Sequence, residues 1–468
     1  MRRASGLDAQ FLYAETSATP MHTLKIAIAN PPESGPLDID QIRQRFAASL
    51  HRLPPFHWQV LPTPLGLHHP MWIDQPDFDL DYHVRRMAVP APGGDRELCD
   101  VISEIAAWPL DRNRPLWQLY VIDGLAGGRV ATVAKVHHAI ADGVSSAELL
   151  MNYLSTEPID ASLGPAELAR DPVPSWLSLL WMAVRDQLRH IFVRLPQLLR
   201  AIRLARRKRQ EPQAHTAGQV PSLYSGPPTP WNKPLTPYRS FAFFTVPLAE
   251  ARSVASAFDV KVNDVFLSSV AGGLRAYLLE KDALPDKPLV GGMPASTRTE
   301  ELRHMWGNCL VALAVPLRTD IEDPIERLQA TIEGTRAVKY ELAISQGARP
   351  EDWLELYPPF FLKLVNKLGA GVIKAGGPAV HNLIVSNVPG PRKQLYHNRT
   401  PIENFVSVGP PIEGVGLNIT VWSYLENLNY SFLACRDLIP DLWHLAEQVR
   451  GGFEELKQAA EREHLRSA

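Results

Sequence analysis

The sequence has little cysteine, no long apolar run and almost no net charge. Its three cysteines, Cys99, Cys309 and Cys435, are scattered, so they give no disulfide framework and fit a reducing compartment. No apolar run reaches the roughly 18 residues of a membrane-spanning helix, and the basic N-terminus lacks the apolar core of a signal peptide. The formal net charge of −2 argues against nucleic-acid binding. We therefore expect a cytoplasmic protein without nucleic-acid partners.

Two motifs of common catalytic sites are also missing. The sequence contains no Gly-x-Ser-x-Gly, which argues against a serine hydrolase with its nucleophile on a sharp turn. A zinc site normally takes three or four ligands from two clusters of residues, and the sequence contains no recognisable second cluster. We therefore expect no bound metal.

The length and composition predict an ordinary globular protein with two domains. A chain of 468 residues is too long for one ordinary core, and 45% apolar and 21% charged residues are typical of folded proteins. Segments with strand and helix patterns alternate in both halves of the chain. The stretch that separates the two halves has a different composition, which is basic and rich in proline. We expect an N-terminal α/β domain at residues 1–170, a linker at 171–238 and a C-terminal α/β domain at 239–468.

The predicted linker is basic and helical at first, then rich in proline. Apolar residues recur at helical spacing over residues 176–204, where Pro196 should kink or split the helix. The segment is rich in arginine and runs into Arg206-Arg207-Lys208-Arg209. Such a helix can lie on an anionic membrane, or it can pack against its own domains with the arginines in solvent. Both interpretations remain open, and the prolines of residues 221–237 predict an extended crossover.

One stretch combines residues of catalytic type, His137-His138-Ala139-Ile140-Ala141-Asp142-Gly143, which we call the histidine turn. The apolar run before it predicts a buried strand, and the segment after it predicts a helix with Ser145 and Glu148 as a capping box. Two imidazoles and a carboxylate are thus expected on a strand-to-helix turn. The other doublet, His68-His69, has Ile73 at the position of the aspartate.

Residues of these types are compatible with a metal site, a hydrolase fragment or a transferase base. The missing second ligand cluster and the missing nucleophile motif disfavour the first two. What remains is a histidine that acts directly as general base on a hydroxyl, thiol or amine. A single histidine is more often a structural residue, so the hypothesis depends on the histidine and the aspartate together.

The histidine turn resembles the signature of CoA-dependent acyltransferases with the chloramphenicol acetyltransferase fold. Along nearly its whole length, the chain resembles the bacterial wax ester synthase/diacylglycerol acyltransferases. A departure is His381, where that family often has an aromatic residue. The other pieces of the resemblance follow in the family's order: Leu7-Asp8 to Glu15, Pro20-Met21-His22, Phe78-Asp79-Leu80, His83-Val84, Pro115-Leu116-Trp117, Asn263-Asp264-Val265, Pro294 to Arg298, Gly307-Asn308, Ser386 to Pro391 and Gly416 to Ile419.

The resemblance implies two similar α/β sandwich domains with mixed sheets and a tunnel between them, joined by the basic, Pro-rich linker. It implies transfer of an acyl group from long-chain acyl-CoA to a lipid hydroxyl. The acceptor would be diacylglycerol, giving triacylglycerol, or a fatty alcohol, giving a wax ester. Acyl-CoA would be a substrate, so no cofactor is expected. Peripheral contact with a membrane or a lipid-body surface would suit such substrates.

The resemblance also implies roles for individual residues. His138 would be the general base and Asn263 the oxyanion donor, although capping of the following helix would equally explain Asn263. Asp142 would orient the turn through an ion pair with Arg298. His137, Gly143 and Asp264 would support the site. The candidates for the substrate channel are Pro115, Leu116, Trp117, Ser386 and Asn387.

Two other functions compete with this one. The chain could be another acyltransferase with a histidine turn, of the type that forms polyketide esters or condenses peptides. It could also be a lipid-binding scaffold that has lost catalysis. The presence of His138, Asp142 and Asn263 together argues against the scaffold.

Overall fold

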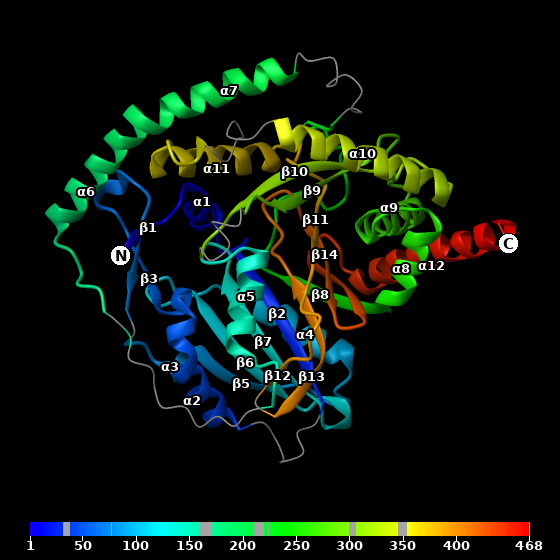
Figure 1. Ribbon diagram of the computed structural model, residues 1–468, viewed down its shortest axis with the longest axis horizontal. Coiled ribbons are helices and arrows are strands. Elements are labelled where there is room, and N and C mark those ends of the chain that lie inside the picture. Colours follow the sequence, from blue (N-terminus) through cyan, green and yellow to red (C-terminus); the bar gives the residue numbers. More distant parts are fainter. Residues whose placement is uncertain are drawn as a thin grey trace.

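The computed structural model describes residues 1–30, 38–75, 77–158, 168, 170–209, 220–222, 224–298, 306–344, 353–397 and 399–467. Two six-stranded sheets organise them (Figure 1). The first sheet has the order β12 (Tyr396–His397), β13 (Thr400–Val408), β2 (His22–Ala29), β7 (Val130–His137), β6 (Trp117–Asp123) and β5 (Val84–Ala88). The second has the order β10 (Leu310–Leu317), β9 (Leu289–Ser296), β11 (Leu383–Val388), β14 (Leu417–Tyr424), β15 (Asn427–Cys435) and β8 (Arg239–Pro247).

Both sheets are mixed. Strands β5 and β6 run parallel in the first sheet, β11 runs parallel to both of its neighbours in the second, and the other pairs are antiparallel. A small antiparallel sheet contains β1 (Arg2–Arg3), β4 (Met71–Asp74) and β3 (Trp58–Leu61). The sequence predicts a hairpin from residues 417–425 and 428–435, and it is confirmed, because β14 and β15 pair from Leu417↔Ala434 to Tyr424↔Asn427. The Gly-rich turn at residues 124–128 predicts antiparallel pairing of the strands on either side, and β6 and β7 pair in this way.

Helices cover the sheets and extend from them. In Figure 1, α6, η5 and α7 run as one long rod along the outer edge of the molecule. The longer helices are α1 (Gly6–Ala14), α2 (Ile39–Ser49), α4 (Asp95–Ala107), α5 (Gly143–Tyr153), α6 (Trp176–Arg189), the π-helical turn η5 (His190–Arg194), α7 (Leu195–Arg209), α8 (Leu248–Ala257), α9 (Val262–Glu280), α10 (Pro324–Ile344), α11 (Pro359–Lys374) and α12 (Leu442–Ser467).

Strand β7 is buried along all eight of its residues, because both faces of the first sheet are covered. One face contributes to a core with α2 and α5, including Phe46 and Leu149. The other face contributes to a core with α4, including Leu98 and Ile102. The histidine turn therefore begins at the end of a strand that is fixed from both sides.

The second half of the chain completes the first sheet. Strand β13 pairs with β2 over the register Val408↔Leu24 to Ile402↔Ala29, with a bulge near Asn404. Trp422 of β14 also belongs to the core under the first sheet. The two sheets are therefore not built from separate stretches of sequence, and the predicted boundaries at 170 and 238 stay a prediction.

One local expectation is wrong. The apolar residues between Phe78 and Val84 predict a strand region, but Leu80–His83 form the short helix α3, in which the Asp79 side chain accepts the backbone N–H of Asp81. Pro196 was expected to kink or split the linker helix, and the α-helical hydrogen bonding is interrupted by η5 directly before it. Proline has no N–H for the carbonyl four residues earlier, which lies in η5, and the helix resumes as α7.

Candidate active site

The histidine turn connects β7 to α5 as predicted, but its cap differs from the predicted one. Helix α5 begins at Gly143, so Asp142 takes the capping position, and its Oδ1 accepts the backbone N–H of Ser145 at 2.8 Å. The expected capping box starting at Ser145 is therefore wrong. The Ser145 hydroxyl instead donates to the carbonyl oxygen of Gly307 at 3.3 Å.

His138 is held in one orientation by an asparagine from the other half of the chain. Its Nδ1 lies 3.1 Å from Oδ1 of Asn308, and its ring stacks on Phe11 with the centroids 4.2 Å apart. Nδ2 of Asn308 already donates to Oδ1 of Asp8 at 2.7 Å and to the His138 carbonyl at 2.7 Å. Because Nδ2 is the donor in both bonds, Oδ1 is the acceptor, and the imidazole proton lies on Nδ1.

This arrangement leaves Nε2 of His138 with a free lone pair. Burial lowers the pKa of His138 to about 4, although the neighbouring Asp142 carboxylate and the bond to Asn308 act in the opposite direction. The imidazole is therefore neutral at pH 7. A neutral ring with its proton fixed on Nδ1 can accept a proton at Nε2, as a general base must.

Asp142 and Arg298 form a buried ion pair, as the family resemblance implied. Nη2 of Arg298 lies 3.1 Å from Oδ2 of Asp142, and both side chains are almost completely buried. The same carboxylate oxygen accepts the backbone N–H of Cys309 at 2.9 Å. Arg298 also donates to Ser145 Oγ and to the Gly307 carbonyl. The carboxylate thus ties the start of α5 to the segments that flank residues 299–305.

A cavity of about 410 Å³ lies between the two sheets and is lined by His138. Ser386 and Asn387 of β11 line it too, and their role in a substrate channel stays a prediction. Gly143 lines it too, and a Cβ atom there would lie 3.2 Å from Cγ2 of Val388, so glycine permits this close approach. Much of the lining is apolar: Phe11, Pro294, Ala295, Leu310, Ala312, Ile384, Val388, Pro389, Val408, Pro410 and Ile412.

The segment Pro115-Leu116-Trp117 does not line this cavity. Leu116 and Trp117 are buried in the core of the first sheet, and the Trp117 indole N–H donates to the Phe56 carbonyl at 2.8 Å. The ring of Trp117 stacks on those of Phe46 and Phe56. The assignment of this segment to the substrate channel is therefore wrong for this cavity, because its large side chain packs away from it.

Asn263 occupies a different position from the predicted cap. Helix α9 starts at Val262, its N-cap is Lys261, and the side chain of Asp264 accepts the Lys261 backbone N–H at 3.3 Å. Capping by Asn263 is therefore wrong. Oδ1 of Asn263 accepts a hydrogen bond from Nδ2 of Asn387 at 3.1 Å, which links it to the cavity wall. Its oxyanion role stays a prediction.

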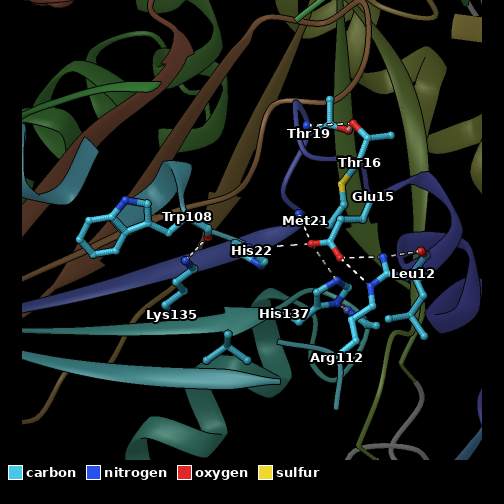
Figure 2. Close-up of polar contacts among 12 residues, drawn as sticks. Leu12, Glu15, Thr16, Thr19, Met21, His22, Trp108, Arg112, Lys135 and His137 are labelled. Carbon is cyan, nitrogen blue, oxygen red and sulfur yellow. Dashed lines mark hydrogen bonds and ion pairs between the residues drawn. The ribbon is translucent and has the colours of Figure 1, made fainter. Parts of the chain in front are cut away.

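Behind the histidine turn lies a buried polar cluster that sequence analysis missed (Figure 2). Oε1 of Glu15 lies 3.4 Å from Nε2 of His137 and 3.8 Å from Nε2 of His22. Its other oxygen accepts two hydrogen bonds from Arg112. Burial alone would raise the pKa of Glu15, but the bond to His137 and the charges around it hold the pKa well below its usual range.

Glu15, His22 and His137 are of the types that bind transition metals, and their ligand atoms lie within 4.8 Å of one another. Arg112 already compensates the charge of Glu15 and donates two hydrogen bonds to one oxygen of its carboxylate. The cluster therefore suits a metal poorly, and we derive no step through one. The cluster contacts the histidine turn through His137, which agrees with the supporting role expected for this residue. The absence of a metal stays a prediction.

Asn308 and Asp8 had no predicted role, although both lie in motifs that carry the family resemblance. Their presence in the motifs Gly307-Asn308 and Leu7-Asp8 was the signal in the sequence that could have marked them as site residues. The pairing itself joins residues 300 positions apart, so periodicity and spacing could not show it.

The two mixed sheets, the cavity between them and the histidine turn on its wall have the arrangement expected of an acyltransferase of the chloramphenicol acetyltransferase-like class. The family models for the wax ester synthase/diacylglycerol acyltransferase catalytic domain and for the WS/DGAT C-terminal domain match residues 4–266 and 306–457. The chain belongs to the wax ester synthase/diacylglycerol acyltransferase family, as the sequence motifs predicted.

Relatives and solved structures support this assignment along the whole chain. Two proteins of Mycobacterium tuberculosis that carry the provisional name diacylglycerol O-acyltransferase are 38% and 36% identical to it, and each alignment covers 98% of this chain and at least 97% of the relative. The wax ester synthase/diacylglycerol acyltransferase from Marinobacter aquaeolei VT8 is 26% identical, with a TM-score of 0.67 over 98% of this chain and 99% of that one.

The first condensation domain of the calcium-dependent antibiotic synthetase shares the fold alone. It has 15% identity and a TM-score of 0.59 over 98% of this chain and 96% of that one. The predicted class, α/β with mixed sheets in a chloramphenicol acetyltransferase-like arrangement, is confirmed. The detailed extent of the linker stays a prediction.

Proposed function

We propose that this protein transfers a long-chain acyl group from acyl-CoA to the hydroxyl of a lipid, either diacylglycerol or a fatty alcohol. The observation that carries the proposal is the neutral His138 imidazole, which has its proton fixed on Nδ1 and lines an apolar cavity of about 410 Å³. The names of the mycobacterial and Marinobacter proteins support this class of acceptor.

In the proposed reaction, Nε2 of His138 accepts the proton of the acceptor hydroxyl as its oxygen attacks the thioester carbonyl. The tetrahedral intermediate collapses with cleavage of the C–S bond, and the imidazolium returns the proton to the CoA thiolate. No covalent acyl-enzyme is formed. The apolar cavity would hold both substrates together and keep water from the thioester.

The direct test is release of free CoA, measured with a thiol dye, from palmitoyl-CoA and a panel of lipid alcohols. We expect the wild type to release CoA with an acceptor and His138→Ala to be slower by about 10²-fold or more. His51→Ala, an exposed histidine, is the matched control. Activity of His138→Ala within a few-fold of wild type would overturn the base assignment. No release with any lipid alcohol would favour a non-catalytic scaffold.

We further propose peripheral contact with an anionic membrane through the helices α6 to α7 and α11. Many large apolar side chains of these helices are exposed, such as Phe192 at 74% and Phe360 at 67%. The side chains of Gln187 and His190 bond to the carbonyls of Leu356 and Glu355, just before α11, which places the two segments beside each other (Figure 1). No helix among the described residues is long and apolar enough to span a membrane.

The charge distribution supports an anionic partner. Residues 176–209 and 359–374 carry 12 of the 48 Lys and Arg residues but one of the 50 Asp and Glu residues. These two segments therefore have a formal charge of +11, and the rest of a chain with net charge −2 has −13. Basic residues near an anionic surface each contribute about 1 kcal/mol to binding.

Sedimentation with phosphatidylglycerol-containing vesicles tests this surface. We expect binding at low salt that weakens when Arg200, Arg203, Arg206 and Arg207 are changed to Gln. Changing four exposed arginines elsewhere, Arg52, Arg96, Arg252 and Arg450, should leave binding unaltered. Equal binding of both variants and the wild type would contradict the proposed contact.

A further inference from the structure

A lysine is buried in the wall of the cavity that His138 lines. Lys25 of β2 is 3% exposed, and its Nζ lies 2.5 Å from the hydroxyl of Ser407, its register partner on β13. The same Nζ lies 4.8 Å from the centre of the Trp422 ring. Lys25, Ser407 and His138 all line the cavity. A lysine is rarely buried without a partner of opposite charge, so its place here requires an explanation.

The described residues give Lys25 a single hydrogen-bond acceptor and no ion pair. Asp142 attracts it electrostatically, but the two carboxylate oxygens of Asp142 already accept bonds from Ser145, Cys309 and Arg298. Burial lowers the pKa of Lys25 to about 7. In either protonation state the amine has at least two N–H groups, and only one of them can point at the Ser407 hydroxyl.

Two hydroxyl groups near Lys25 along this wall already donate to acceptors within the protein. The Thr420 hydroxyl donates to Oδ1 of Asn418 at 2.8 Å, and Nδ2 of Asn418 donates to the Pro410 carbonyl at 3.2 Å. The hydroxyl of Thr23 donates to the Val136 carbonyl. Unlike the hydroxyls of Thr23 and Thr420, Lys25 therefore still has an N–H group for a ligand.

We propose that Lys25 determines acceptor specificity by donating a hydrogen bond to an ester carbonyl of diacylglycerol. A simple fatty alcohol has no acceptor besides its reacting hydroxyl, so its hydrocarbon chain would leave the buried amine unpaired. A site built around a hydrogen bond discriminates strongly against an analogue that lacks the partner. The inference rests on the proposed acyltransferase function and names the lipid class that the cavity prefers.

The test compares three acceptors with one labelled acyl-CoA: a 1,2-diester glycerol, the 1,2-diether glycerol of the same shape, and hexadecanol. For the wild type, we expect kcat/KM to fall at least about tenfold from the diester to the diether. In Lys25→Met, which has a similar length without the amine, diester and diether should react alike. Activity toward hexadecanol should remain within a few-fold of wild type.

Thr23→Val is the matched control, because it lies two residues away on β2 and also lines the cavity. It should keep the wild-type ratio of diester to diether. Equal use of diester and diether by the wild type would overturn the inference without any variant, even if Lys25→Met fails to fold. An equal loss toward all three acceptors in Lys25→Met would overturn it too, since the lysine would then act on the acyl donor or on folding. Failure to release CoA with any acceptor would instead overturn the proposed function.

Discussion

His138 can act as a base only while its imidazole is neutral. Burial lowers its pKa to about 4, compared with about 6.5 for an exposed histidine. The neutral form is present above the pKa and lost as the pH falls through it, so the acid limb of kcat/KM should lie far below pH 6.5. We expect the rate to stay level from about pH 8 to about pH 5.5. A pH–rate profile that loses half its activity near pH 6.5 would contradict the proposed environment of the ring.

Asn308 should matter for turnover more than for binding. It accepts the Nδ1 proton of His138, and without it the ring can rotate or carry its proton on Nε2. We expect Asn308→Ala to lower kcat by about a hundredfold with little change in KM. The exposed Asn113→Ala is the control. A normal kcat in Asn308→Ala would show that the ring is oriented by Phe11 stacking alone.

At the scale of elements, the ion pair between Asp142 and Arg298 joins α5 to the segments around β9 and β10. Removal of one partner leaves a buried charge without compensation, which costs about 3–5 kcal/mol. We expect Asp142→Ala to lower the free energy of unfolding by this amount in a denaturant titration. Asp40→Ala, in an exposed pair with Arg43, should change it by no more than about 1 kcal/mol. Unaltered stability with lost turnover would place Asp142 in the chemistry.

Local pattern predicted the elements better than their contacts. The strand before the histidine turn and the hairpin of β14 and β15 follow from apolar patterning, and both are present. The cap of α5 was placed three residues late, because an aspartate that looked catalytic also satisfies the helix start. Trp117 was assigned to the channel because a motif does not show which face of a strand carries its side chain.

The contacts that make the site belong to the tertiary fold. His138 depends on Asn308, and Lys25 meets Ser407 across 382 residues of chain. Neither pair has a local signal, since both arise where β2 or the turn meets residues from the second half. The ion pair of Asp142 with Arg298, 156 residues apart, was predicted from the family resemblance, and periodicity had no part in it.

At the scale of the molecule, the first sheet cannot be completed without the second half of the chain. Strand β2 pairs with β13 along one edge, and Phe405, Trp422 and Tyr424 fill the core beneath that sheet. A fragment of residues 1–209 would expose the edge of β2 and lack these aromatic side chains. Exposed edges of this kind promote aggregation. We therefore expect the fragment to be insoluble or to unfold without cooperativity, and co-expression with residues 220–468 to recover a soluble complex. A soluble, monomeric fragment with a sharp thermal transition would instead show that residues 1–209 fold alone, and that β13 adds to a sheet that is already stable.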